Sequence, residues 1–335
     1  MNTNDFKSVK ELKQRFDWLD VAKGLGIIAV VISHSRCYEL IWILSACYVP
    51  VFFVCSGYTF KIKNGQTYSK FIVQKIKRLL VPYIFCISII ILFNYIVNII
   101  FLQPFDWWRS IIGSIYSRAM LYPMNIEPNV YMLPMNSQPM WFLTALFITL
   151  QISYYILRIQ MKKMIMILSI FILLIITYVM TFIPILLPWS VDCISIFTIM
   201  MLFGMYINKY RLINLPWYTY IIMTIVYLMI ISYNGEVNFS IRLYGKSLFM
   251  TIISSLLGSL LLMKLSLWIS KITWLSRLLI TIGRNSLYIM CLHLPLLTIG
   301  HKLTNDSTNN LLNICSVLFA ISLSYVCSRI IERYF

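Results

Sequence analysis

The chain has 335 residues, of which 60% are hydrophobic and only 12% are charged, with a formal net charge of +17. A soluble chain carries about a quarter charged residues, so this much apolar surface excludes a water-soluble fold and makes lipid the expected solvent. The basic residues recur in short clusters between apolar segments instead of forming one patch, which argues against nucleic acid as a partner.

Apolar segments of spanning length follow one another along the whole chain. We therefore expect an all-α, polytopic integral membrane protein with about ten transmembrane helices, in which residues 1–335 form a single membrane-embedded domain. The polar sequence at 283–286 and Pro295 interrupt the ninth span. In chain order, the predicted spans cover roughly 21–40, 41–60, 81–103, 140–159, 164–184, 190–207, 216–233, 246–264, 278–299 and 312–330.

The basic residues orient this topology. The connections on one side, together with the two terminal segments, hold 21 Lys and Arg residues, whereas those on the other side hold five. By the positive-inside rule, the N-terminal segment 1–20 and the C-terminus are both cytoplasmic. The basic loop predicted at 61–80 is then cytoplasmic too, where it can hold anionic membrane lipids or a polyanionic cofactor.

The predicted outer loop at 104–139 is much longer than the others. Its aromatic and amide side chains suit stacking on a sugar and hydrogen bonding to it, but they equally suit an interfacial belt that anchors a surface helix. The sequence leaves both interpretations open. The side chains concerned are Trp107, Trp108, Tyr116, Tyr122, Tyr131, Asn125, Asn129, Asn136 and Gln138.

The first span contains three polar residues at helical spacing, Asp20, Lys23 and His34. At about 100° per residue they share one helix face, and a rise of 1.5 Å per residue puts His34 about 16 Å from Lys23 along the axis. A polar stripe inside a span is expected to face the bundle interior. Because imidazole titrates near physiological pH, His34 could act as a general base, or it could simply bond to a neighbouring helix.

Three further polar residues lie in or beside spans. Arg284 could bind phosphate bidentately or serve as a snorkelling or interhelical arginine. His293 lies nine residues further on, which places it on the opposite side of a regular helix, and this favours a structural role. Asp192 could cap the sixth span or contact an acceptor. The eight cysteines form no CxxC pair, so we expect neither a metal site nor a disulfide framework.

Six segments resemble the membrane-bound acyltransferase family 3, which includes polysaccharide O-acetyltransferases. They run through nearly the whole chain in family order, and two of them are most similar to the branch of fucose 4-O-acetylase-like and enterobacterial-common-antigen-type acetyltransferases. These two are PMWFLTALF at 139–147 and PWSVDCISIFTIMMLFG at 188–204. The other four are RFDWLDVAKGLGIIAVVISHS at 15–35, VPVFFVCSGYTF at 49–60, KIKRLLVPY at 75–83 and IGRNSLYIMCLHLPLL at 282–297.

The resemblance implies a multi-pass protein of the bacterial inner or plasma membrane. It further implies transfer of an acyl group, usually acetyl from cytoplasmic acetyl-CoA, to a hydroxyl of a cell-envelope glycan or lipid-linked saccharide. The family's basic residue and histidine, eleven positions apart, fall on Lys23 and His34, although many relatives carry arginine at the first position. Other family elements fall on Arg78, Trp141, Asp192, Arg284, Asn285, Ser286 and His293.

These residues suggest a mechanism. Arg78 and Arg284, with Lys75 and Lys77 of the basic loop, would hold the CoA phosphates, and His34 would act as general base on the sugar hydroxyl. Asp20 and Lys23 would set the polarity between them, while the acceptor would meet Trp141, Asp192, Asn285, Ser286 and His293. Direct transfer and an acyl-histidine intermediate both fit. The alternatives are a polysaccharide exporter or flippase, which the lack of an inverted repeat disfavours, and an O-succinyltransferase of an exported polysaccharide.

Overall fold

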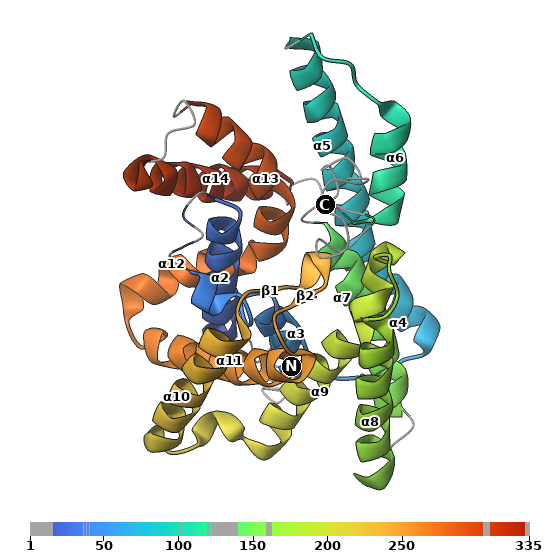
Figure 1. Ribbon diagram of the computed structural model, residues 1–335, viewed down its shortest axis with the longest axis vertical. Coiled ribbons are helices and arrows are strands. Elements are labelled where there is room, and N and C mark those ends of the chain that lie inside the picture. The colour runs from blue at the N-terminus through green and yellow to red at the C-terminus, as the bar shows by residue number, and fades with distance from the viewer. Residues whose placement is uncertain are drawn as a thin grey trace, which may run out of the picture.

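Helices make up nearly all of the structure, a computed structural model that describes residues 16–35, 37, 39, 41–100, 102–118, 121, 140–158, 163–303 and 309–331. The described ranges contain one short antiparallel strand pair, in which Val237 faces Tyr244 and Asn238 faces Leu243. The all-α prediction is confirmed (Figure 1). Most of the predicted outer loop, including Tyr122, Tyr131, Asn125, Asn129, Asn136 and Gln138, lies outside the described residues.

The elements follow one another with short connections. The first half of the chain contains α2 (Asp17–Ser33), η2 (Trp42–Leu44), α3 (Pro50–Tyr58), α4 (Tyr68–Lys75), the π-helical turn η3 (Ile76–Leu80), α5 (Val81–Ile100), α6 (Trp107–Tyr116), α7 (Trp141–Arg158) and α8 (Lys163–Met180). The second half contains η5 (Pro188–Cys193), α9 (Ile194–Tyr210), η6 (Leu212–Asn214), α10 (Trp217–Asn234), β1 (Val237–Asn238), η7 (Phe239–Ile241), β2 (Leu243–Tyr244), α11 (Leu248–Ile269), α12 (Thr273–Arg284), α13 (Ser286–Leu303) and α14 (Asn310–Ile331).

Six helical segments among the described residues are long and apolar enough to cross a membrane. Several of them expose large apolar side chains, such as Leu92 and Ile96 on α5 or Phe171 on α8, as expected for helices that face lipid. These observations support the prediction of a membrane protein. The segments are Tyr68–Ile100, Trp141–Arg158, Pro188–Tyr210, Trp217–Asn234, Leu248–Ile269 and Asn310–Ile331.

Two predicted spans are not continuous helices. In the segment 41–60, a 3₁₀ turn and α3 replace the expected span, and α3 has only 9 residues because Pro50 stands at its start. Helix α3 is almost wholly buried between α2, α9 and α11. A broken helix is tolerated there because protein, not lipid, surrounds its ends. The span expected at 278–299 is divided into α12 and α13, which meet at Asn285.

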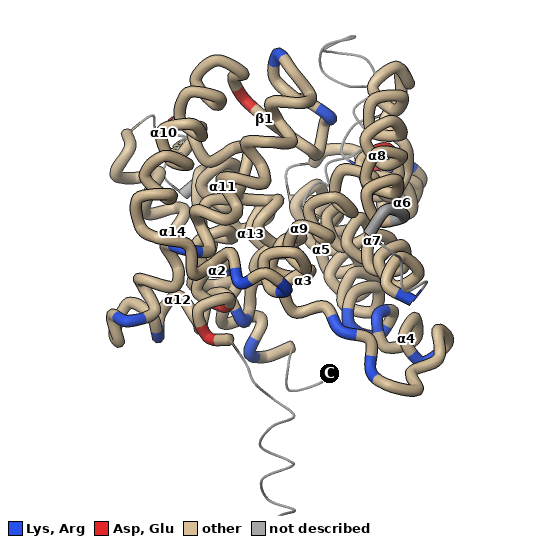
Figure 2. The backbone as a smooth tube through the Cα atoms, turned by 90° about the horizontal axis from the view of Figure 1, so that it is seen from below, with Lys and Arg blue, Asp and Glu red and all other residues tan. Residues whose placement is uncertain are grey.

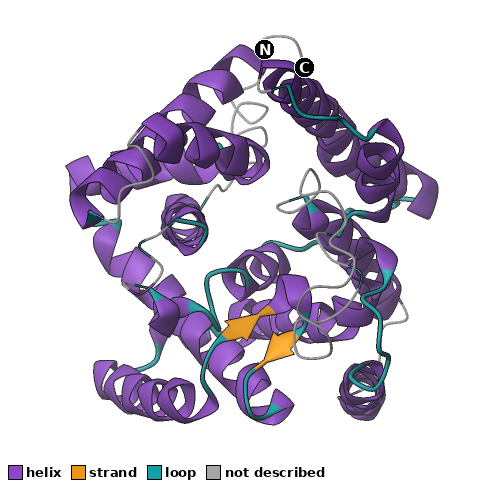
Figure 3. Ribbon diagram, turned by 45° about the horizontal axis from the view of Figure 1, so that its top comes forward, coloured by secondary structure: helices purple, strands orange, loops and turns teal. Residues whose placement is uncertain are grey.

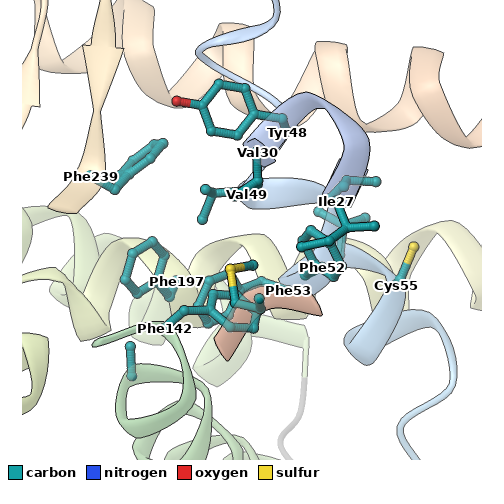
Figure 4. Close-up of a cluster of buried hydrophobic side chains, with 14 of the residues drawn as sticks. Ile27, Val30, Tyr48, Val49, Phe52, Phe53, Cys55, Phe142, Phe197 and Phe239 are labelled. Carbon is teal, nitrogen blue, oxygen red and sulfur yellow. The ribbon is translucent and has the colours of Figure 1, made fainter. Parts of the chain in front are cut away.

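Helix α2 occupies the centre of the bundle and packs against α3, α11, α12, α13 and α14. Beside it, an aromatic cluster joins α3, α7 and α9 (Figure 4). Phe53 stacks on Phe197 with ring centroids 4.2 Å apart, and Phe142 meets Phe52 and Phe53 edge-on at 5.5 and 5.2 Å. Phe142 is therefore held by packing on two sides, which fixes the start of α7 relative to α3.

Charge is distributed unevenly between the two ends of the bundle. Figure 2 shows the basic residues concentrated at the end that holds α4, α12 and the beginning of α2, while the hairpin lies at the other end. The segment 61–80, predicted as a basic loop, is helical from Tyr68 onward. Figure 3 shows the two strands packed among the helices. The two ends therefore offer ligands very different surroundings.

Candidate active site

A cavity of about 820 Å³ opens among α2, α3, α7 and the junctions α4–α5 and α12–α13. We call it the basic cavity. Asp20 is the one carboxylate among the described residues that line it, so its net charge is strongly positive and suits a polyanionic ligand. Its cationic lining residues are Lys23, Lys61, Lys75, Lys77, Arg78 and Arg284.

Three of these cations come from the junction between α4 and α5. Lys75 ends α4, and Lys77 and Arg78 lie in the π-helical turn η3. A π turn is uncommon and is frequently found at functional sites. It allows these three side chains to line the same cavity although they are nearly adjacent in sequence. The candidate cofactor-binding residues from this segment are thus brought together.

An ionic cluster links the start of α2 to the end of α12. Lys23 Nζ lies 3.3 Å from Asp20 Oδ1, and Arg284 Nε lies 3.3 Å from Asp20 Oδ2. Arg284 also donates from Nη2 to Asp17 Oδ1 at 2.9 Å. Helical spacing correctly predicted that Asp20 and Lys23 share a face, but it gave no indication that Arg284 would pair with both aspartates.

Two glycines allow this cluster to form where α2 crosses α12. A Cβ atom on Gly283 would overlap the carbonyl oxygen of Asp20, and one on Gly24 would overlap the carbonyl oxygen of Leu279. The two backbones are therefore in direct contact. This close approach brings the carboxylate of Asp20 within reach of Arg284, the residue that follows Gly283.

The boundary between α12 and α13 is stabilised by Asn285. Its side-chain amide donates to the carbonyl of Thr281 at 2.7 Å, and its Oδ1 accepts from Ser328 Oγ on α14 at 2.8 Å. Asn285 is buried, so these bonds give it a structural role, whereas its neighbour Ser286 lines the basic cavity. The opposite-face argument for Arg284 and His293 assumed one regular helix, and the break at Asn285 removes that assumption.

His34 and His293 lie side by side. Their ring centroids are 5.2 Å apart and the ring planes are tilted by 42°. His34 stands at the C-terminal end of α2, where the helix stops. The Nδ1 of His293 donates to the carbonyl of Ile289 at 3.0 Å, and its buried Nε2 has no hydrogen-bond partner among the described residues. The sequence proposed each histidine separately but did not indicate that they form a pair.

A second cavity, of about 270 Å³, contains His34. We call it the histidine pocket. Its lining includes Trp141, as the resemblance implied for an acceptor-binding residue, and also Glu236, which the sequence analysis did not single out. The remaining lining residues are Val30, Ser33, Ser45, Tyr48, Val49, Phe142, Val237, Asn238, Phe239, Ser240 and Met290.

Phe142 and Met290 line both cavities. The basic cavity and the histidine pocket are therefore neighbours, with these two side chains between them. Met290 lies on α13 one turn before His293, and Phe142 lies on α7 directly after Trp141. A long ligand in the basic cavity would need to pass only these side chains to reach His34.

Hydrogen bonds hold the β hairpin against the histidine pocket. Ser45 Oγ accepts from the backbone N–H of Val237 at 3.3 Å. The side chain of Asn234 donates to the carbonyl of Tyr244 at 3.2 Å and accepts from the N–H of Ser247 at 2.8 Å. The hairpin is thus bonded to the segments before α3 and after α10, and it forms a fixed wall.

Asp192 supports the same wall from behind. It is fully buried and paired with Arg118 and Arg242, and it lines neither cavity. Arg118 also donates to the carbonyls of Phe239 and Ser240, at 3.4 and 2.7 Å. The possible cap is not observed, because Cys193 is the N-cap of α9 and no side chain caps it. In this arrangement Asp192 reaches the pocket only through η7.

The glycine crossing, the paired histidines and the two adjoining cavities form one continuous site across the bundle. No match is found among curated proteins or among solved structures. Comparison with protein families matches residues 16–332 to the acyltransferase domain of acyltransferase family 3. This match spans nearly the whole chain and includes every residue of the two cavities, so the chain belongs to the acyltransferase 3 family.

Proposed function

We propose that this acyltransferase is an O-acyltransferase that moves an acyl group, in the first instance acetyl, from acyl-CoA to a hydroxyl of a cell-envelope glycan or lipid-linked saccharide. The observation that carries the proposal is the contact between two dissimilar cavities at Phe142 and Met290, with His34 immediately beyond them. One cavity suits an anionic donor and the other a small polar acceptor.

The basic cavity supports the assignment of acyl-CoA as donor. Lys75, Lys77 and Arg78 would hold phosphate groups, since ammonium and guanidinium groups bind phosphate through charge-assisted hydrogen bonds. Arg284 shares its charge with two aspartates, so we assign it mainly to shaping the cavity mouth. The pantetheine arm would extend along the apolar lining of α7, toward Phe142 and Met290.

The chemical step takes place beside His34. The imidazole accepts the proton of the acceptor hydroxyl, whose oxygen attacks the thioester carbonyl carbon. The C–S bond breaks, and the proton passes from His34 to the departing CoA sulfur. In the acyl-histidine alternative, the imidazole attacks first and the hydroxyl then takes the acyl group from it. His293 lies next to the reacting ring in both schemes.

The orientation is part of the proposal. We place the end that carries α4, α12 and the beginning of α2 in the cytoplasm, because basic residues concentrate there (Figure 2). Both chain termini would then be cytoplasmic, in a bacterial plasma membrane. Acyl-CoA would be taken from the cytoplasm, and the acceptor would reach the histidine pocket from the opposite face.

Incubation of purified protein in detergent with radiolabelled acetyl-CoA or succinyl-CoA and an envelope glycan extract tests this proposal. We expect label on the glycan, and the more efficient donor identifies the acyl group. Release of unlabelled CoA should match the label transferred. A polysaccharide exporter would leave both donors intact, and that result would overturn the proposal.

A further inference from the structure

The histidine pocket differs in charge from the basic cavity beside it. The basic cavity is lined by six cations and one carboxylate, whereas the described lining of the histidine pocket contains no lysine or arginine and one carboxylate, Glu236. Two adjoining cavities with opposite charge will select ligands of opposite charge preference. The pocket's lining is thus unsuited to the anionic donor and must select for something else.

Glu236 is available to a ligand. It is exposed, and among the described residues none forms an ion pair or hydrogen bond with its carboxylate. It stands between Gly235, whose φ of +82° ends α10, and Val237, whose N–H is held by Ser45. The backbone on both sides is therefore fixed, and the carboxylate is presented at the pocket wall.

The rest of the lining suits a single sugar ring. Tyr48, Trp141 and Phe239 offer aromatic surface, and Ser33 and Asn238 offer polar groups. The volume of about 270 Å³ is near the lower end of the range of about 300–1,000 Å³ that is usual for small-molecule pockets. Apolar walls with a few convergent polar groups bind a ligand that is amphipathic and small.

We propose that the histidine pocket binds one sugar unit of the acceptor and that Glu236 selects the charge of that unit. This inference rests on the proposed transferase function and specifies its acceptor class: neutral or amine-bearing sugars are accepted and uronic acids are rejected. A carboxylate accepts hydrogen bonds from hydroxyl or ammonium groups, and it repels a second carboxylate held close to it in a poorly hydrated pocket. Glu236 is thus a specificity-determining residue, separate from the proton transfer at His34.

The test compares the methyl glycosides of glucose, glucosamine and glucuronic acid as acceptors for the purified protein, with acetyl-CoA as donor. We expect kcat/KM to be at least about tenfold higher for the first two than for the glucuronoside, since tenfold corresponds to about 1.4 kcal/mol of discrimination. Glu236→Gln should reduce this ratio to less than about threefold, and Glu236→Lys should favour the glucuronoside. The KM for acetyl-CoA should not change.

Glu39→Gln is the matched control, because Glu39 is an exposed carboxyl that lines neither cavity. Equal efficiency toward all three glycosides in the unmodified protein would overturn the inference, as would Glu236 variants that behave like Glu39→Gln. Labelling of envelope glycans without labelling of any glycoside would overturn it as well and leave the transferase function standing. Labelling of neither would contradict the transferase function itself.

Discussion

The imidazole rings of His34 and His293 lie 5.2 Å apart, although they come from the first and the second-last helices of the described chain. The hydrogen bond from His293 Nδ1 to the Ile289 carbonyl fixes its tautomer, which leaves Nε2 as an acceptor that is buried and unpartnered. A neutral imidazole with one free lone pair therefore adjoins the proposed base. We infer that His293 is a positioning residue for His34 and for the incoming hydroxyl.

Replacement of His293 tests this positioning role. We expect His293→Phe, which keeps a planar ring but removes both nitrogens, to lower kcat by up to about 100-fold through misalignment of the reacting groups. The KM for acetyl-CoA should stay unchanged because His293 does not line the basic cavity. His293→Gln should recover part of the rate, since an amide oxygen can replace the acceptor nitrogen. Equal rates for the Phe and Gln variants would show that the ring serves packing alone.

Arg78 provides a test of donor binding. A charge-assisted hydrogen bond contributes about 1.5–3 kcal/mol, so Arg78→Gln should raise the KM for acetyl-CoA by roughly ten- to 100-fold. The effect should shrink as salt is added, because screening weakens the same attraction in the unmodified protein. Arg277→Gln serves as the control, since Arg277 is exposed and lines neither cavity. An unchanged KM in Arg78→Gln would remove this residue from the donor site.

The contact between α2 and α12 predicts a cost for any side chain at Gly283. Gly283→Ala places a methyl group against the Asp20 carbonyl, and overpacking of this kind destabilises by about 1–3 kcal/mol. We expect a lower melting temperature in detergent and a weakened ion pair between Asp20 and Arg284. Thr281→Ala, at an exposed position on the same helix, should melt close to the unmodified protein. If both variants melted alike, the two helices would not be in contact.

Asp192 provides the test of the hairpin wall. Its removal leaves the buried guanidinium of Arg118 without its carboxylate, and breaking a buried ion pair from one side typically destabilises by about 3–5 kcal/mol. Asp192→Ala should therefore reduce thermal stability strongly and raise the KM for the acceptor more than that for acetyl-CoA. Asp106→Ala, which removes an exposed carboxylate, should have a far smaller effect. A direct acceptor contact would instead alter the acceptor KM without loss of stability.

The sequence was informative where local periodicity decides the structure. Apolar segments correctly predicted a helical membrane protein, and helical spacing placed Asp20 beside Lys23. The family resemblance brought Trp141 and the basic residues of η3 into consideration, and these do line the two cavities.

What the sequence could not indicate depends on contacts between distant segments. The pairing of His34 with His293 follows from the packing of α13 on α2. Glu236 is a single carboxylate in a short connection, and only the hairpin bonds bring it to the pocket. Its isolation on the side with few charges was the one available signal. The break at Asn285 depends in part on a hydrogen bond from Ser328, which lies on another helix.

The central claim is that His34 takes the proton of the acceptor hydroxyl next to the donor thioester. The most direct test measures acetyl transfer by purified His34→Ala together with binding of acetyl-CoA to the same preparation, with Ser33→Ala as a control from the same pocket. We expect His34→Ala to bind acetyl-CoA normally and to lose about 10²–10⁴-fold in transfer rate, while Ser33→Ala keeps most of its activity. Normal transfer by His34→Ala would contradict the account.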